Sequence, residues 1–192
     1  MKKVTVILAV MLMSVNGFSQ SVFDKFEGLD EVTSVILNQK MFKMLATMGM
    51  DLDDPKAKEL VEMANNITGF KVFTTGDEKI SSDMKSAVAS HLKSSKLEEL
   101  MRIKDGNQTV NFYVKEGKDE NHVKELLMFI SGLKEMTKRE DIEINGEKRE
   151  FETVVLSLTG NIDLRQISEL TNQMNVPGGE QLKKASAKKN KK

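Results

Sequence analysis

The sequence predicts an α+β fold, a ferredoxin-like (split βαβ) sandwich extended by an N-terminal strand and helix pair. From residue 69 to residue 159 the expected elements run in the order strand, helix, strand, strand, helix, strand, which is the split βαβ pattern. Two turn sequences, Asp105–Gly106–Asn107 and Asn145–Gly146, each separate two extended segments, as in β-hairpins. Hydrophobic residues at 39% and charged residues at 30% are ordinary for a globular domain.

The N-terminal extension begins with residues 32–38, which alternate and are rich in β-branched residues, as in a strand. A helix follows and ends at Gly49. A second helix begins at Pro55 with Asp54 as its cap. The apolar positions of the two helices recur at helical spacing: Met41, Met44, Leu45 and Met48 in the first, and Leu60, Val61, Ala64 and Ile67 in the second.

The split βαβ region begins with a strand over 69–75 and a helix over 81–94. The apolar face of this helix carries Met84, Ala87, Val88 and Leu92. Strands over 97–104 and 109–115 follow, joined by the Asp105–Gly106–Asn107 turn. In the second of them Val110, Phe112 and Val114 point one way, and Asn111 and Tyr113 the other.

We expect a helix over 120–132, capped by Asp119, because its apolar residues recur at helical spacing. They are Val123, Leu126, Leu127, Ile130 and Leu133. The run 150–159 reads as a strand, and Val155 indicates that it is buried on both faces and central in the sheet. Asp163 then caps a short helix, with Gln166 completing a capping box.

The first nineteen residues (1–19) form a secretory signal peptide. Lys2 and Lys3 precede about twelve apolar residues, which as a helix span about 18 Å, well short of the ~30 Å hydrocarbon core of a membrane. Gly17 and Ser19 supply the small residues before a cleavage between Ser19 and Gln20. We therefore expect an exported protein, periplasmic or secreted, that does not span the membrane and is soluble after signal cleavage.

The domain organisation then reads as one α+β domain over 20–176 and a disordered Lys-rich tail over 177–192. The whole chain has 29 basic and 29 acidic residues, but Lys2, Lys3 and the six lysines of 183–192 lie outside the body of the domain. Residues 20–182 keep 21 basic against 29 acidic residues, a net charge of −8. An acidic body argues against nucleic acid as a partner, because phosphate neutralisation drives most of that affinity.

Composition also removes much chemistry. The chain has no Cys and two His, which excludes disulfides, thiolate metal sites and Cys nucleophiles. Asp51, Asp53 and Asp54 fit helix capping better than a calcium loop, which requires spaced acids and a turn glycine. Met41, Met44 and Met48 on one helix face fit core packing better than a soft-metal site.

The remaining candidates are equally unspecific for catalysis. His91 and His122 lie on the two helices of the predicted sandwich, and neither has an identifiable acid–base partner in the sequence. Ser81, Ser82 and Asp83 fit a helix N-terminus. Thr159–Gly160–Asn161 is not a phosphate loop. We therefore assign no catalytic, cofactor-binding or metal-binding residue and expect no cofactor.

Several segments together resemble the domain of unknown function 4252 family, small exported proteins found mainly in Bacteroidetes-type bacteria. They are FDKFEGLDEVTSVILNQKMFKML (23–45), ITGFKVF (67–73), LMRIKDGNQTVNFYVKEG (100–117), HVKELLMFISG (122–132) and VVLSLTGNIDLRQISEL (154–170). The resemblance covers most of the chain after residue 22. It implies a periplasmic or envelope setting beside extracytoplasmic sigma-factor signalling, and it supplies no catalytic residues.

The leading hypothesis is a non-enzymatic envelope protein that binds a protein partner or a small ligand through the open face of its sheet or through its helix layer. Two alternatives remain open: a hydrolase-type enzyme with a carboxylate-based site, and a metal-handling protein that uses the Met face. The chemistry of a bound metal or of converging acids and imidazoles would distinguish them.

Overall fold

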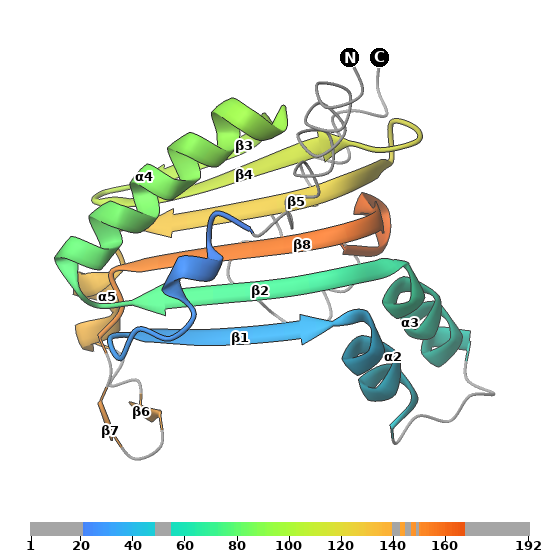
Figure 1. The fold of residues 1–192 in the computed structure, drawn as a ribbon, viewed down its shortest axis with the longest axis horizontal. Coiled ribbons are helices and arrows are strands. Elements are labelled where there is room, and N and C mark those ends of the chain that lie inside the picture. Colours follow the sequence, from blue (N-terminus) through green and yellow to red (C-terminus); the bar gives the residue numbers. More distant parts are fainter. Residues whose placement is uncertain (1–20, 49–54, 140–142, 145–146, 149, 168–192) are drawn as a thin grey trace, which may run out of the picture.

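The structure is a computed structural model that describes residues 21–48, 55–139, 143–144, 147–148 and 150–167. Six antiparallel strands form one sheet in the order β1-β2-β8-β5-β4-β3 (Figure 1). The strands are β1 (Val32–Asn38), β2 (Ile67–Thr75), β3 (Glu98–Asp105), β4 (Gln108–Glu116), β5 (His122–Ser131) and β8 (Thr153–Asp163). The α+β class is thus confirmed.

The helices are distributed unevenly around this sheet. Helix α4 (Glu78–Ser95) and the 3₁₀ turn η2 (Asp24–Phe26) lie on the face turned toward the viewer in Figure 1. Helices α2 (Gln39–Thr47) and α3 (Pro55–Asn66) lie together at the end of β1 and β2. Helix α5 (Lys134–Arg139) and the small hairpin of β6 (Glu143–Ile144) and β7 (Glu147–Lys148) join β5 to β8.

The segment predicted as a helix over 120–132 is instead strand β5, and that prediction is wrong. β5 pairs with β8 on one side and β4 on the other, so it is a central strand. Leu126 packs on one face of the sheet, and Leu127 and Phe129 pack on the other. A strand that is buried on both faces reads as a continuous apolar run, which periodicity does not separate from a helix.

Since the second helix of the split βαβ pattern is a strand, the ferredoxin-like arrangement is not confirmed. The chain instead makes an antiparallel β3–β4–β5 meander, and β8 inserts between β5 and β2. Only the β2–α4–β3 connection crosses the sheet face, because β2 and β3 lie far apart in the strand order. The prediction that Val155 belongs to a central strand is confirmed by the position of β8.

Other predicted elements agree with the structure closely. β1 has the predicted bounds, and the β3–β4 hairpin closes at Gly106, whose φ is +54°. Helix α4 begins three residues earlier than predicted because Asp77 is its cap and accepts the Ile80 N–H at 2.8 Å. Ile67 was placed in a helix, but it opens β2. Asp163 caps the helical residues 164–167, as its Oδ1 accepts the Arg165 N–H at 2.9 Å.

The buried apolar residues form two clusters, one on each face of the sheet, and the first lies between α4, η2 and the sheet. Phe23 and Phe26 of the N-terminal segment pack edgewise or tilted on Phe73 of β2. Met84, Ala87 and Val88 of α4 are buried, as the sequence predicts. The cluster also includes Leu97, Leu127, Phe129 and Val155.

Candidate functional site

The face of the sheet opposite α4, which we call the open face, is lined mainly by apolar side chains, with Thr33, Thr74 and Glu98 toward its two edges. The strand register aligns them in three rows. The central row runs Val35, Val72, Leu156, Met128, Phe112 and Met101; a second row runs Thr33, Thr74, Val154, Ile130, Val110 and Ile103; and the third runs Leu37, Phe70, Leu158, Leu126, Val114 and Glu98. With strands about 4.8 Å apart, each row is roughly 24 Å long.

The face under α4 is more polar than the open face. Lys71, Asn111 and Ser157 lie on the α4 side, among the residues of the core. Thr75 and Thr153, both fully buried, lie on this side as well. In an antiparallel sheet with one solvated face, the polar residues normally occupy the solvated side. Here the distribution is reversed, which indicates that the open face is built to be covered.

The open face is partly accessible to solvent. Helices α2 and α3 contribute Phe42 and Met63 to it at one end, and Phe42 packs edgewise on Phe70 with ring centroids 5.8 Å apart. In the central row, by contrast, Val72, Leu156 and Met128 are only half-buried. Phe112, Val114, Leu126 and Leu158 on the same face are buried, so the accessible apolar surface is the part of the central row on β2, β8 and β5, together with Val35 of β1, which is 45% exposed. An accessible apolar surface is typical of a binding surface.

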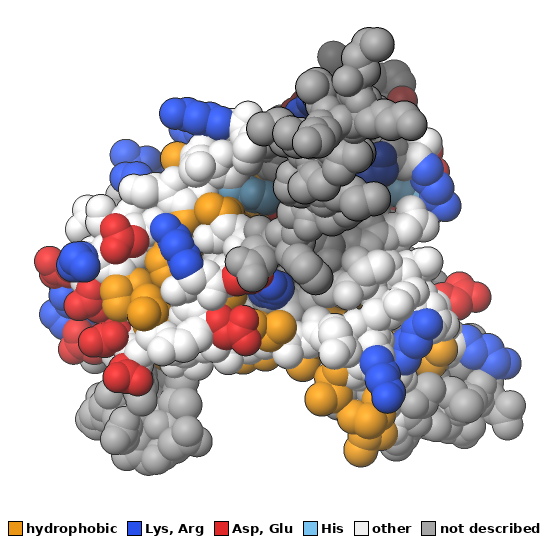
Figure 2. Space-filling model, in the orientation of Figure 1, with side chains coloured by type: hydrophobic (Ala, Val, Ile, Leu, Met, Phe, Trp, Pro, Cys, Tyr) orange, Lys and Arg blue, Asp and Glu red, His pale blue; other side chains and the backbone are white. Residues whose placement is uncertain are grey.

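Methionine side chains add a second exposed apolar region on α2. Met41, Met44 and Met48 are 39%, 48% and 64% exposed, so the prediction that they pack in the core is wrong. Figure 2 shows hydrophobic side chains gathered over α2 at the lower right, next to lysines. The buried side of this helix is instead represented by Phe42, one residue away from the predicted stripe.

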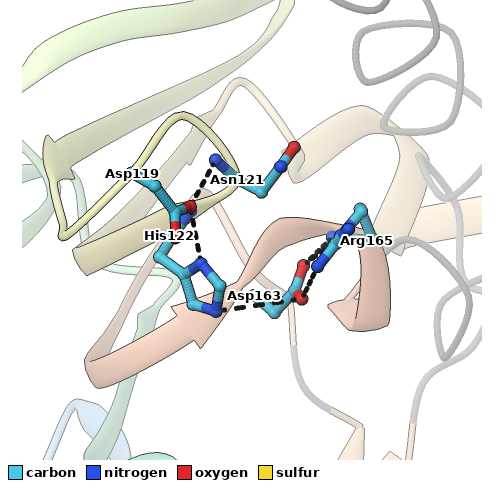
Figure 3. Close-up of polar contacts among 5 residues, drawn as sticks. All are labelled: Asp119, Asn121, His122, Asp163 and Arg165. Carbon is cyan, nitrogen blue, oxygen red and sulfur yellow. Dashed lines mark hydrogen bonds and ion pairs between the residues drawn. The ribbon is translucent and has the colours of Figure 1, made fainter.

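The two histidines take different carboxylate partners. His122 does not open a helix as predicted but lies at the start of β5, where its Nδ1 is 2.7 Å from Oδ1 of Asp119. Its Nε2 is 3.9 Å from Oδ2 of Asp163, at the end of β8. Arg165 holds Asp163 through two hydrogen bonds, donated by Nε at 3.0 Å and a terminal guanidinium nitrogen at 2.6 Å (Figure 3).

This group of side chains joins a turn to the end of a strand. Asp119 Oδ1 also accepts the backbone N–H groups of Asn121 and His122, which closes the turn before β5 (Figure 3). The hydrogen bond from His122 lowers the pKa of Asp119, and the hydrogen bond from Arg165 lowers the pKa of Asp163. Both carboxylates are therefore stabilised in the ionised state on either side of the imidazole.

His91 lies on α4 as the sequence predicts and reaches across to the sheet. Its Nε2 is 2.7 Å from Oε1 of Glu125 on β5, and both side chains are largely buried. Phe23 packs edgewise on the imidazole with ring centroids 5.4 Å apart. The pair therefore fastens α4 to the central strand. Within the described ranges, no three His, Asp or Glu side chains gather as a metal-binding group.

The serine candidates lie in the first turns of α4 beside a polar groove. Ser81 Oγ is 2.6 Å from Oγ1 of the buried Thr153, and Ser82 and Asp83 are exposed. The groove has a volume of about 620 Å³ and is lined by Ser81, Ser82, Lys85, Glu78, Lys134 and Glu152, among others. Lys134 and Glu78 form an ion pair at 2.9 Å within it. Among the described residues, the hydrogen-bond partner of the Ser81 hydroxyl is thus the Thr153 hydroxyl and not a base.

Thr159–Gly160–Asn161 belongs to β8 and has a structural explanation. Gly160 has a φ of +146°, and a Cβ there would lie 2.1 Å from the carbonyl oxygen of Asn66. The glycine therefore lets β8 approach the junction of α3 and β2. Ser19, Gln20, the signal peptide, Asp51, Asp53, Asp54 and the tail after Pro177 lie outside the described residues.

Sequence reasoning proposed an open sheet face as a binding surface but did not find the residues that β5 contributes to it, because it read 120–132 as a helix. It also missed Asp163 and Glu125 as partners of the two histidines. Leu126, Met128 and Ile130 on one face and Leu127 and Phe129 on the other are all apolar, so β5 appears in the sequence as a continuous apolar run without polar–apolar alternation. Pairing this run with β4 through the turn before residue 122 places Ile130 beside Val110 and Met128 beside Phe112.

Searches of curated proteins and of solved structures returned no match to this chain. In the described part of the chain, no helix combines the length and the apolarity needed to cross a membrane. Residues 26–170 match the family described as "Domain of unknown function (DUF4252)". This span covers most of the chain, including all six strands of the large sheet. The chain therefore belongs to the DUF4252 family.

Proposed function

We propose that the protein is an exported, non-enzymatic binding module of the cell envelope, and that it binds a protein partner through the open face of its sheet. The observation that carries the proposal is the inverted polarity of the sheet: apolar rows cross the open face, while Lys71 and Asn111 lie on the face under α4. Export rests on the leader-like pattern of residues 1–19 and on the Ser19–Gln20 cleavage motif.

The chemistry of the open face indicates what kind of partner fits it. Its rows carry side chains without charge apart from Glu98 at the margin on β3. A partner that covers them must present an uncharged apolar surface, because burying an unpaired charge there is costly. Half-buried Met128 and Met101 have adaptable side chains that suit a surface repacking on contact. An amphipathic segment of another envelope protein, including a signalling component, meets these requirements.

Site-specific photocrosslinking in the native envelope tests this proposal. A photoreactive residue at Val72 lies in the central row, and one at the exposed Ala89 lies on α4 as a matched control. We expect a discrete crosslinked partner from Val72 and none from Ala89. The partner is then purified and its affinity measured directly. Equal crosslinking from both positions, or none from Val72, contradicts the proposal.

A charged substitution in the same row tests the proposal through the affinity for the purified partner. Met128→Glu introduces a carboxylate in the centre of the open face and should weaken binding of the purified partner at least tenfold. Ala89→Glu should leave that affinity unchanged. Thermal unfolding of both variants shows whether the fold is intact, so that lost binding is not confused with lost structure. Unchanged affinity in a folded Met128→Glu variant contradicts the proposal.

A hydrolase is the second candidate, favoured by the alignment of Asp119, His122 and Asp163 around one imidazole (Figure 3). Acid–imidazole–acid groupings of this kind can support general acid–base chemistry. Turnover of generic ester, phosphate or glycoside substrates that disappears in His122→Gln would favour it. The binding proposal expects no such turnover in either protein.

A further inference from the structure

The two edges of the sheet are protected to very different degrees. β3 carries Glu98, Glu99, Arg102, Lys104 and Asp105, and its pairing with β4 is interrupted by a bulge between Glu99 and Met101. Charges and bulges are the usual devices that prevent an edge strand from pairing with another chain. β1 has neither, since its sequence is VTSVILN and its seven residues pair with β2 without interruption.

The open edge of β1 presents apolar side chains as well as backbone groups. Val35 and Ile36 are 45% and 37% exposed, one on each face of the sheet. Two hydrogen bonds show which residues of β1 direct their backbone groups away from β2. The Thr75 carbonyl oxygen accepts the Glu152 N–H, on the β8 side of β2, and the Val32 N–H is donated to the Leu29 carbonyl oxygen, away from β2. Because the backbone groups of successive residues in a strand point to alternate sides, Ser34 and Ile36, like Val32, direct their N–H and C=O groups to the open edge.

The charges that flank β1 are self-complementary for antiparallel pairing. Asp30 and Glu31 precede the strand, and Lys40 follows it in the first turn of α2. All three side chains are exposed. If two copies pair about Val35, Asp30 and Glu31 of one copy lie at the same end of the junction as Lys40 of the other. Each end of the junction then brings a carboxylate toward an ammonium group, while the uncharged strand fills the middle.

We propose that a second copy of this chain docks on the β1 edge, in an antiparallel β1–β1 pairing whose two-fold axis passes through Val35. Ser34 and Ile36 of each copy then form hydrogen-bonded pairs with Ile36 and Ser34 of the other. Val35 meets its counterpart as a non-hydrogen-bonded pair, the closer kind, with Cα atoms about 4.5 Å apart. This pairing covers both exposed side chains of the edge and leaves no open strand there.

The dimer does not depend on the proposed partner-binding function, but it enlarges the open face. Val35 ends the central apolar row in one copy, and its counterpart begins the same row in the other. The two rows therefore join into one surface that runs through both sheets. Loss of the dimer would halve this surface without removing it, so a test of oligomeric state and a test of partner binding give separable results.

Single-cysteine crosslinking tests the register, and the chain suits it because it contains no cysteine. The full coding sequence is expressed and the protein purified as the host processes it. Val35→Cys places two sulfurs across the axis at a separation that a disulfide spans. Ile36→Cys, of similar exposure, lies diagonally at about 7–8 Å between Cα atoms, beyond that span. We expect mild oxidation to give near-complete covalent dimer from Val35→Cys and little from Ile36→Cys.

The oligomeric state itself is measured by analytical ultracentrifugation at micromolar concentration. The unmodified protein should sediment as a dimer. Ser34→Pro removes an outward N–H and should give a monomer with an unchanged circular dichroism spectrum, since proline is tolerated on an edge. Ile36→Lys, a second route to the monomer, guards against a folding defect in the proline variant, and Ser34→Ala should remain dimeric. A monomeric unmodified protein, equal crosslinking of both cysteine variants, or a dimeric Ile36→Lys variant overturns the proposal.

Discussion

His122 stands between two carboxylates that each have a further partner, so the stability of this corner depends on proton concentration. The hydrogen bonds from Arg165 lower the pKa of Asp163 below its ordinary value of 3.8. A depressed pKa means that the ionised carboxylate stabilises the folded state above about pH 3.8 and that this contribution is lost as the pH falls through the lower, folded-state value. The folded state should therefore keep this stabilisation in mild acid and lose it only when the pH falls through the lowered, folded-state pKa of Asp163.

Asp163→Asn tests this reasoning. The variant should be about 1 kcal/mol less stable than the unmodified protein at pH 6, because the charged hydrogen bonds to Arg165 and the helix cap are weakened. The difference should shrink as the pH falls below 3.8. Urea unfolding at a series of pH values measures both quantities. A stability difference that stays constant down to pH 2.5 contradicts the assignment.

Gly160 allows the effect of a single added methyl group on stability to be predicted. A methyl group there would lie 2.1 Å from the Asn66 carbonyl oxygen, and the backbone φ of +146° is unfavourable for any other residue. Gly160→Ala should therefore lower the free energy of unfolding by on the order of 2–3 kcal/mol. Gly28→Ala is the matched control, because nothing lies within 4 Å of a Cβ at that position. Comparable effects of the two substitutions would show that the close contact with Asn66 does not determine the loss of stability.

At the scale of elements, helix α2 allows its exposed and buried sides to be compared directly. Met48 directly follows the last residue of α2, and Met48→Ser should change the free energy of unfolding by less than about 0.5 kcal/mol, because the side chain is 64% exposed. Phe42→Ala should cost about 2 kcal/mol, because it removes the edgewise contact with Phe70. Chemical denaturation measures both. If the methionine substitution destabilises the protein more, Phe42 is not the side chain through which α2 packs on the sheet.

The same helix shows why some elements were predictable and others were not. β1, the β3–β4 hairpin and the inward face of α4 followed from local signals, namely β-branched alternation, a Gly-containing turn and apolar spacing. For α2 the spacing of Met41, Met44 and Met48 was right but its side was wrong, since periodicity shows that a face is apolar and not what it packs against. β5 was not predicted because a strand with apolar residues on both faces carries no period-two signal.

The candidate site was predictable only in part for a related reason. Its polar groups meet across long sequence separations, such as His91 with Glu125 and His122 with Asp163. No spacing rule within the sequence connects residues on different elements. The open face likewise depends on which strands are neighbours, and that information came from the sheet order rather than from any one strand. Local sequence therefore predicts the elements better than it predicts what they assemble.

For the whole molecule, amide hydrogen exchange reports the strand order and the edges together. Amides of β8 and β5, the two central strands, should exchange most slowly, since these strands lie farthest from both edges of the sheet. The outward amides of β3 should exchange fast. At β1, the Ser34 and Ile36 amides should be protected in the unmodified protein and become fast in the Ile36→Lys variant. Fast exchange of both amides in the unmodified protein would show that this edge is bare.

The position of β8 has a consequence for how the molecule forms. This strand is the last of the large sheet in the chain, yet it lies between β2 and β5 and hydrogen-bonds to both. Until it is in place, no strand pairing joins the β1–β2 pair to the β3–β5 meander. A ribosome must therefore have synthesised beyond Asp163 before the sheet can close.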